Sequence, residues 1–313
     1  MSDVEILISE VGPRDGLQSI DRVMPLESKK LWIATEAAAG VREIEVGSFV
    51  PPKLLPQMSD TAELVAYARG IDALTVAALV PNLKGARAAV AAGAHKIGLP
   101  LSVSEAHSLA NLRRSHAQMR DEIRAIADYL AGLPTERRPA FEVGLSTAFG
   151  CSIAGEIPEI DVLRLAEAAI AAGCDEVGLS DTTGYANPAQ VKRLTEAVKR
   201  TVGDERMTSL HLHNTRGLGL ANAYAGLEAG VTTLDASLGG LGGCPFAPGA
   251  SGNIVTEDLV FMLDAMGVRT GIDYTRLVEV RSLLREALPG EPLYGFTPEV
   301  GLPKGHRPAR AAA

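Results

Sequence analysis

A short pattern recurs four times in this 313-residue sequence and limits its fold more than any other feature. In each copy an alanine-containing run ends in glycine, and an apolar run begins three residues later. Glycine suits the left-handed end of a helix, and the apolar run suits a buried parallel strand. The four glycines are Gly40, Gly93, Gly173 and Gly230. The pattern therefore predicts helices that alternate with the strands of a parallel sheet.

Further apolar runs bring the number of predicted strands to eight. They cover residues 4–11, 43–46, 73–80, 96–99, 140–146, 176–179, 207–213 and 233–236. Eight strand–helix units in a chain of this length fit a closed (β/α)₈ barrel better than a doubly wound sheet. The glycines recur at unequal intervals, which argues against a solenoid repeat. We therefore predict an α/β fold, a TIM barrel with an extra C-terminal helix and a tail.

The helical patterns give the domain organisation. A helix is expected at 26–39, a longer helical stretch at 104–131 and a C-terminal helix at 277–288. We assign residues 1–290 to one barrel domain. The Pro/Gly-rich residues 291–313 are expected to form a tail over the barrel surface, with a disordered end.

The composition of the chain limits the kinds of partner that it can bind. A net charge of −8 opposes a general attraction to nucleic acid or to anionic membranes, so a small-molecule substrate is expected. No apolar run approaches the roughly 20 residues that span a bilayer. The three cysteines, Cys151, Cys174 and Cys244, are few and widely spaced, which fits a reducing compartment. We expect a cytoplasmic protein.

A His-x-His pair ends the seventh predicted strand. Because side chains alternate along a strand, His211 and His213 point the same way. Such a pair can bind a metal ion, although two histidines hydrogen-bonded in a polar strand end would give the same pattern. The other four histidines are expected on a solvated helix, at a strand start or in the tail: His107, His116, His95 and His306.

Other predicted strands also end in polar residues, which is where TIM barrels assemble active sites. These residues are Arg14, Asp15, Gln18, Glu45, Ser48, Asp181, Thr182 and Asn214. The eighth strand is followed by the glycine-rich loop 239–253. This loop could be a flexible surface loop, but its cysteine, phenylalanine and two prolines favour a loop that approaches a ligand.

These residues suggest a metal site. Asp15, His211, His213 and Asn253 form a mixed nitrogen and oxygen ligand set that suits Mg²⁺ or Mn²⁺, with zinc possible, and leaves room for substrate. Arg14 could stabilise an oxyanion beside this metal. Alternatively, Arg14 forms an ordinary ion pair, for example with Glu45.

Several motifs together resemble the 3-hydroxy-3-methylglutaryl-CoA lyase family, within the Asp-Arg-Glu metallolyase superfamily of TIM barrels. They occupy residues 10–18, 48–53, 56–58, 181–184, 211–213, 217–222, 240–245 and 249–253. The resemblance covers roughly residues 5–265. It implies metal-dependent retro-Claisen cleavage of a branched 3-hydroxyacyl-CoA to acetyl-CoA and a keto acid. The same resemblance suggests a homo-oligomer, a dimer or larger.

The resemblance also implies roles for individual residues. Asp15, or a water molecule that it orients, would be the base, and Arg14 would stabilise the acetyl-CoA enolate. Cys244 would protonate the enolate carbon, while Glu45 and Asp181 would orient groups or assist proton transfer. The residues expected to bind substrate are Gln18, Ser48, Asn214 and Arg216.

Two departures from the family pattern concern the acyl group. The histidine pair is usually followed by Asp, Thr and Tyr, whereas this chain has Asn214, Thr215 and Arg216. The substrate could therefore be 3-hydroxy-3-methylglutaryl-CoA or a relative such as citramalyl-CoA. The alternatives are a metal-dependent aldolase or Claisen-condensing synthase on the same barrel, and a catalytically inactive binding protein.

Overall fold

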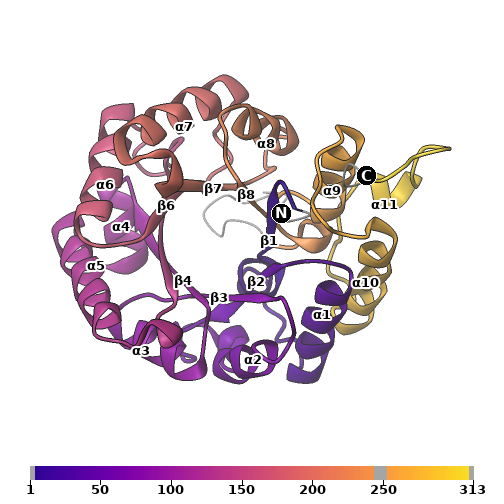
Figure 1. Cartoon of the computed structure of the whole chain (residues 1–313), viewed down its shortest axis with the longest axis horizontal. Helices are drawn as coiled ribbons and strands as arrows, with labels where there is room; N and C mark the ends of the chain where they lie inside the picture. The colour runs from indigo at the N-terminus through magenta and orange to yellow at the C-terminus, as the bar shows by residue number, and fades with distance from the viewer. Residues whose placement is uncertain (1–3, 243–251, 310–313) are drawn as a thin grey trace.

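The computed structural model describes residues 4–242 and 252–309, and it has the predicted barrel architecture (Figure 1). Eight parallel strands follow one another around a closed barrel in sequence order, and β1 pairs with β8 to close it. The strands are β1 (Leu7–Glu10), β2 (Glu43–Ser48), β3 (Thr75–Leu79), β4 (Lys96–Ser102), β5 (Ala140–Ser146), β6 (Glu176–Asp181), β7 (Met207–Leu212) and β8 (Thr233–Ala236). The prediction of an α/β TIM barrel is thus confirmed.

Helices surround the barrel in the order in which they follow the strands (Figure 1). They are α1 (Leu26–Ala38), α2 (Thr61–Ala68), α3 (Leu83–Ala92), α4 (Glu105–Leu112), α5 (His116–Ala131), α6 (Glu159–Ala171), α7 (Pro188–Val202), α8 (Gly219–Glu228), α9 (Thr256–Ala265), α10 (Tyr274–Ala287) and α11 (Thr297–Val300). Helix α10, the predicted C-terminal helix, lies beside α1, and its Arg276 donates a hydrogen bond to Ala38. Within the described residues, no helix combines the length and apolarity needed to cross a membrane.

The four glycines of the repeated pattern adopt the backbone conformation that the pattern predicts. Their φ angles are +105° at Gly40, +94° at Gly93, +108° at Gly173 and +78° at Gly230. A side chain at Gly40 would also be blocked, because its Cβ would lie 2.2 Å from the carbonyl oxygen of Gly271. Glycine therefore ends these helices and lets the chain turn into the next strand.

The expected helical stretch 104–131 is two helices, α4 and α5. Arg113 takes a left-handed conformation (φ +56°) that ends α4. Ser115 and Gln118 then form a reciprocal capping box that starts α5. These local hydrogen bonds divide the stretch into two helices, although its apolar pattern is continuous.

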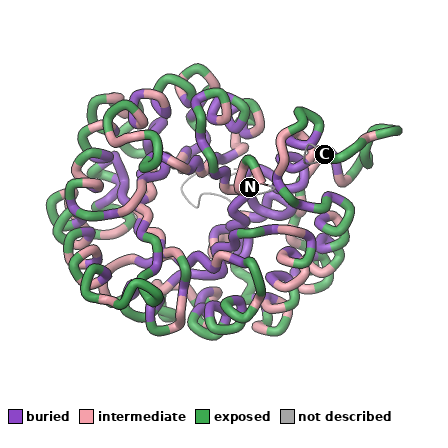
Figure 2. Tube along the Cα trace, viewed as in Figure 1, coloured by how far each residue is buried: buried purple, intermediate pink, exposed green. Residues whose placement is uncertain are grey.

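The barrel wall separates an apolar layer from a polar interior. Side chains that point outward from the strands, such as Ile44, Ile97 and Leu210, are completely buried against the helices. Figure 2 shows this buried layer along the strands and the inner sides of the helices. Inside the barrel, Lys96 lies 2.5 Å from Glu142 and 3.0 Å from Glu176. Packing between sheet and helices therefore supplies the core, and the interior remains available for polar chemistry.

The predicted tail is anchored to the barrel along the part that the structure describes. The backbone N–H of Tyr294 donates to Gly239, 2.7 Å away, and the carbonyl oxygen of Tyr294 accepts a 2.8 Å hydrogen bond from Arg281 on α10. Arg281 also forms a 2.5 Å ion pair with Glu257 on α9, and both side chains are buried. The domain boundary at residue 290 stays a prediction, and the expected disorder of the last residues falls on 310–313, outside the described residues.

Replacing Arg281 by alanine should lower the free energy of unfolding by about 3–5 kcal/mol, because it leaves the buried charge of Glu257 without its partner. Arg285 on the same helix is a matched control, since its side chain is 61% exposed and its pair with Glu299 is a surface pair. Arg285→Ala should cost less than about 1 kcal/mol. Urea unfolding of both variants measures the difference, and equal losses would contradict the assignment.

Candidate active site

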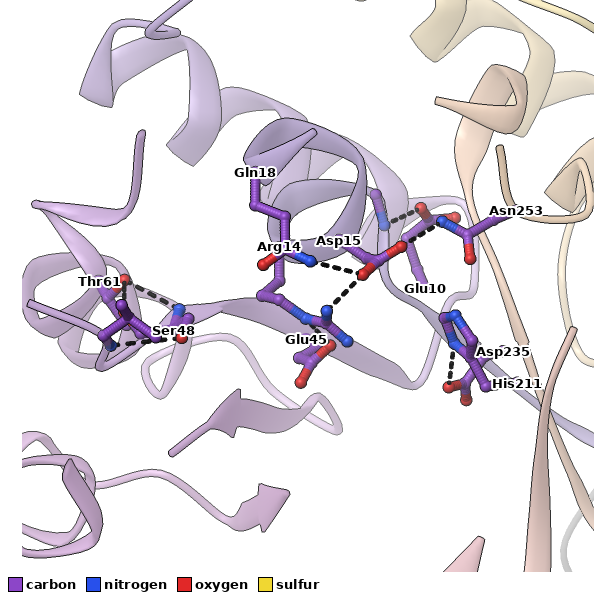
Figure 3. A network of polar contacts seen from close by, with 12 residues as sticks. Glu10, Arg14, Asp15, Gln18, Glu45, Ser48, Thr61, His211, Asp235 and Asn253 are labelled. Carbon is purple, nitrogen blue, oxygen red and sulfur yellow. Dashed lines mark hydrogen bonds and ion pairs between the residues drawn. The ribbon is translucent and has the colours of Figure 1, made fainter. Parts of the chain in front are cut away.

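The candidate site lies at the carboxyl ends of the strands, above a cavity of about 310 Å³ that enters the barrel. Six of the predicted site residues line this cavity: Arg14, Asp15, Gln18, Glu45, His211 and His213. Three of them follow β1, Glu45 lies within β2, and the two histidines lie at the end of β7 and just after it (Figure 3). The fold thus brings together residues that are far apart in the sequence.

A single π-helical turn, η1 (Gly12–Gly16), presents the first two of these residues. The carbonyl oxygen of Val11 accepts hydrogen bonds from the backbone N–H groups of Arg14 and Asp15, at 3.1 and 2.7 Å. Short π-helical segments are rare and often occur at functional sites. This turn places the two side chains next to each other at the cavity mouth (Figure 3).

Arg14 lies between two carboxylates. Its Nη1 donates to Asp15 and its Nε donates to Glu45, so the expected ion pair with Glu45 is present, and the oxyanion role of Arg14 stays a prediction. Burial raises the pKa of Glu45 to about 7, even though Arg14 opposes this shift. Burial acts on Asp15 in the same direction, but the Arg14 guanidinium and the nearby histidines hold the pKa of Asp15 far below its ordinary value. Asp15 is therefore a carboxylate at neutral pH, and Glu45 is poised to exchange a proton.

The two histidines converge as predicted, with their Nε2 atoms 3.2 Å apart. The Nδ1 atom of His211 lies 3.0 Å from the Asp235 carboxylate, and that of His213 lies 3.0 Å from the carbonyl oxygen of Thr182. Both partners are acceptors, so each Nδ1 carries the proton and, in the neutral rings, both Nε2 lone pairs face the same point. A cation at that point removes the repulsion between them.

Asn253, the fourth predicted ligand, lies beside Asp15. Its Nδ2 donates to Asp15 Oδ2 at 2.8 Å, while its Oδ1 is buried and accepts no hydrogen bond from the described residues. Within residues 4–242 and 252–309, Asp15, His211 and His213 are the acidic and histidine side chains close enough together to share an ion, with ligand atoms within 4.8 Å of one another. A carboxylate, two imidazoles and an amide oxygen fit a divalent cation.

Besides Asn253, four predicted residues of the described part of the chain do not line the cavity. Ser48 is buried, and its Oγ accepts a 3.3 Å hydrogen bond from the backbone of Val50 (Figure 3). Asp181 accepts from the backbone N–H groups of Tyr185 and Ala186, and burial raises its pKa. These two residues therefore shape the loops after β2 and β6, and their predicted roles toward substrate stay predictions.

The other two, Asn214 and Arg216, also make contacts within the protein. The Asn214 side chain accepts a 3.0 Å hydrogen bond from Gly219 at the start of α8. The Arg216 guanidinium donates to the carbonyl oxygens of Thr183 and Gly184 and lies 4.6 Å from the centre of the Tyr185 ring. Their substrate-binding role stays a prediction, as does the role of Cys244, which lies outside the described residues.

The structure adds two residues that the sequence analysis did not select. Asp235 of β8 lies opposite His211 in the strand register and orients its ring. The signal in the sequence that could have found Asp235 is that it is a lone acidic residue in an apolar strand. His107 lines the cavity with only 2% of its surface exposed, and its Nδ1 lies 2.7 Å from Ser102 Oγ. The prediction that His107 lies on a solvated helix is wrong, because α4 folds this face onto the end of β4.

Comparison with known proteins agrees with this geometry. The family model described as HMGL-like matches residues 5–284. The chain belongs to the HMGL-like family. It is 38% identical over 294 residues to hydroxymethylglutaryl-CoA lyase YngG of Bacillus subtilis, covering 92% of this chain and 95% of that protein. The resemblance drawn from the motifs is confirmed.

Two further HMGL-like relatives bear on the substrate. The (R)-citramalyl-CoA lyase of Chloroflexus aurantiacus is 39% identical over 308 residues, covering 95% of each chain. A structure of an HMG-CoA lyase from Acinetobacter baumannii, in complex with coenzyme A and 3-methylmalate, superposes with a TM-score of 0.88 at 40% identity. It covers 98% of this chain and 99% of that chain. The relatives thus include lyases named for two different acyl groups.

Replacing Asp235 by asparagine should weaken binding of Mn²⁺ about 10- to 100-fold, because the carboxylate that orients His211 and increases its basicity is lost. Calorimetric titration of the purified variant with Mn²⁺ measures this change. Asp121→Asn, on the exposed face of α5, is the control and should bind Mn²⁺ as the wild type does. Unchanged affinity in Asp235→Asn would show that His211 does not depend on this carboxylate.

Proposed function

We propose that this protein catalyses the metal-dependent cleavage of 3-hydroxy-3-methylglutaryl-CoA, or of a close relative such as citramalyl-CoA, by a retro-Claisen reaction. The products are acetyl-CoA and a keto acid, acetoacetate or pyruvate. The observation that carries the proposal is the position of Arg14, which bridges the metal-ligand candidate Asp15 and the carboxyl group of Glu45 at the cavity mouth. The similarity to named lyases supports the reaction class.

Asp15, His211, His213 and Asn253 would hold the divalent ion, for which Mg²⁺ or Mn²⁺ is expected and zinc is possible. When bound, such an ion supplies Lewis-acid activation of the substrate's tertiary alcohol. Asp15, or a water that it orients, accepts the alcohol proton in this scheme. Because Arg14 keeps the pKa of Asp15 low, Glu45 is a second acceptor of better matched basicity.

The remaining steps concern the carbon–carbon bond. Once the alcohol has lost its proton, its oxygen forms the ketone of the keto acid and the bond to the thioester α-carbon breaks. The electron pair of that bond moves into an acetyl-CoA enolate. Arg14 stabilises the negative charge on the thioester oxygen, and Cys244 returns a proton to the α-carbon. Each proton and electron pair is then accounted for.

The remaining proposals concern the assembly, the location and the substrate of the protein. We infer a homo-oligomer that works in the cytoplasm on an acyl-CoA substrate. A condensing synthase or aldolase on the same barrel would use the same ligand set, and an inactive binding protein would bind neither metal nor thioester productively. The direction of the reaction and its dependence on metal therefore distinguish the three possibilities.

A coupled assay for acetyl-CoA release should detect cleavage of 3-hydroxy-3-methylglutaryl-CoA or of citramalyl-CoA with Mg²⁺ or Mn²⁺, and EDTA should abolish it. The expected result follows from the ligand set, because the alcohol needs the cation to lose its proton near neutral pH. The preferred thioester identifies the acyl group. Protein that binds metal but releases acetyl-CoA from neither thioester would refute the proposed reaction.

Arg14→Lys should lower kcat on the order of 10²- to 10³-fold, since lysine keeps the charge but cannot donate in a fixed fork to two oxygens. Steady-state kinetics on the preferred thioester measure the change. Arg42, an exposed residue just before β2, is the control, and Arg42→Lys should be as active as the wild type. A kcat for Arg14→Lys within threefold of the wild type would exclude Arg14 from enolate stabilisation.

A further inference from the structure

Glu10 is a buried acid directly behind the candidate site. It is the last residue of β1, and its side chain has no exposed surface. Its neighbours Ser9 and Val11 line the cavity, so the side chain of Glu10 points the other way, into the layer between the barrel and the helices. Figure 3 draws Glu10 together with the site residues. Its carboxyl group can act on the site only through other residues.

Three hydrogen bonds connect this carboxyl group to separate segments. Its Oε1 accepts from the backbone N–H of Gly12 at 2.8 Å and from that of Leu238 at 2.9 Å. Its Oε2 is hydrogen-bonded to the Thr256 hydroxyl at 2.7 Å. Gly12 opens η1, Leu238 follows β8, and Thr256 opens α9. One side chain therefore ties together three parts of the chain, and the farthest contact, with Thr256, is 246 residues away from Glu10 in the sequence.

These three segments carry or contact the proposed metal ligands. Asp15 belongs to η1, Asn253 lies three residues before Thr256, and Leu241 accepts a 3.4 Å hydrogen bond from Asn253. The 2.8 Å bond between Asn253 and Asp15 therefore spans two of the segments that Glu10 joins. A change at Glu10 would alter the spacing of the ligands without touching them.

The packing leaves the carboxyl group little freedom to move. A Cβ atom at Gly12 would lie 2.5 Å from Glu10 Oε1, 2.8 Å from the Trp32 ring and 3.0 Å from Ser237 Oγ. Only glycine fits between these groups, and the backbone of η1 can approach the carboxyl group closely for that reason. Glu10 therefore holds η1 at a fixed distance.

Burial favours the uncharged form of Glu10. Glu36 faces it from α1 and Glu257 from α9, while Arg281 of α10 is paired with Glu257. Burial, with a smaller contribution from Glu257, raises the pKa of Glu10 to about 8 against the opposing effect of its hydrogen bonds. At pH 7 the carboxyl group is mainly protonated, so Oε1 accepts the two amide hydrogens. The Thr256 hydroxyl, which donates to Oε2 when the carboxyl group is ionised, can rotate and accept the Oε2 proton instead.

We propose that Glu10 is a positioning residue of this site, a buried hydrogen-bonding group that sets the spacing between Asp15 on η1 and Asn253 before α9. Its importance for turnover rests on the proposed function, whereas its effect on metal binding rests on the ligand set alone. Glutamine reproduces the hydrogen-bonding pattern of a protonated glutamate, with an oxygen for the two amides and an N–H for Thr256. Alanine removes all three hydrogen bonds.

Three purified variants test this proposal by calorimetric titration with Mn²⁺ and by steady-state kinetics. Glu10→Ala should weaken Mn²⁺ binding about 10- to 100-fold and lower kcat at least as much, as is typical when the support of metal ligands is lost. Glu10→Gln should restore both values to within threefold of the wild type. Glu36→Gln is the matched control, because Glu36 is a buried acid in the same layer whose carboxyl oxygens accept no hydrogen bond from the described parts of the ligand segments. This variant should behave as the wild type.

The pH dependence of stability tests the uncharged state separately. The pKa of Glu10 is about 8 in the folded protein and near 4.5 when unfolded, so between these pH values only the unfolded chain releases the proton. The stability that protonated Glu10 contributes is fully present below pH 4.5 and is lost as the pH rises toward 8. The urea midpoint should therefore fall less between pH 5 and 8 in Glu10→Gln than in the wild type.

Several results would overturn the proposal. A folded Glu10→Ala that binds Mn²⁺ within threefold of the wild type would show that Glu10 does not set the ligand spacing. If Glu10→Gln were as defective as Glu10→Ala, the uncharged form of Glu10 would not be the one that acts.

If Glu10→Ala does not fold, Thr256→Val removes one of the three hydrogen bonds and should still weaken Mn²⁺ binding. Wild-type affinity for Mn²⁺ in Thr256→Val would count against the proposal. A wild type that binds Mn²⁺ but cleaves neither thioester would refute the proposed function, and the comparison of Mn²⁺ affinities would still test Glu10.

Discussion

The hydrogen bond between Asn253 and Asp15 depends on closure of the barrel. The two residues are 238 positions apart, and they meet because β8 pairs with β1 from Leu7–Thr233 to Glu10–Ala236. That pairing also brings Asp235 beside the cavity, where it orients His211. An open sheet would leave Asp15 and Asn253 on opposite edges. The candidate metal site is therefore a property of the closed barrel and not of any one strand–helix unit.

Acids with the same intrinsic chemistry take different charge states around this site. Asp15 is buried but lies against Arg14, so it keeps its negative charge. Glu10 is completely buried, and burial raises its pKa to about 8 although its three hydrogen bonds oppose this shift. Glu45 contacts Arg14 and still has a pKa of about 7, because burial outweighs the attraction. The neighbours thus determine which acid binds a cation, which exchanges protons and which only donates or accepts hydrogen bonds.

Local patterns in the sequence were sufficient for the architecture and for part of the site. Glycines at helix ends and the alternation of His211 and His213 depend on a few neighbouring residues, so the sequence expresses them directly. Asp235 could not be assigned a role in this way, because its partner lies on another strand and depends on register. Glu10 was passed over for a similar reason: its three partners are recognisable only when β1, β8 and α9 are placed together. Residues that act through long-range contacts are thus the ones that local patterns miss.

The arginine at position 216 can be understood in the same terms. Its guanidinium holds the carbonyl oxygens of Thr183 and Gly184, and the carbonyl oxygen of the preceding Thr182 accepts the hydrogen bond that orients His213. Arg216 is therefore connected to the candidate metal site through the loop after β6, even though it does not line the cavity. A tyrosine has one hydroxyl hydrogen, whereas Nη1 of Arg216 carries two hydrogens and donates to both carbonyl oxygens. The departure from the family pattern at this position therefore acts first on the loop after β6, whose Thr182 orients His213, and only through that loop on the site.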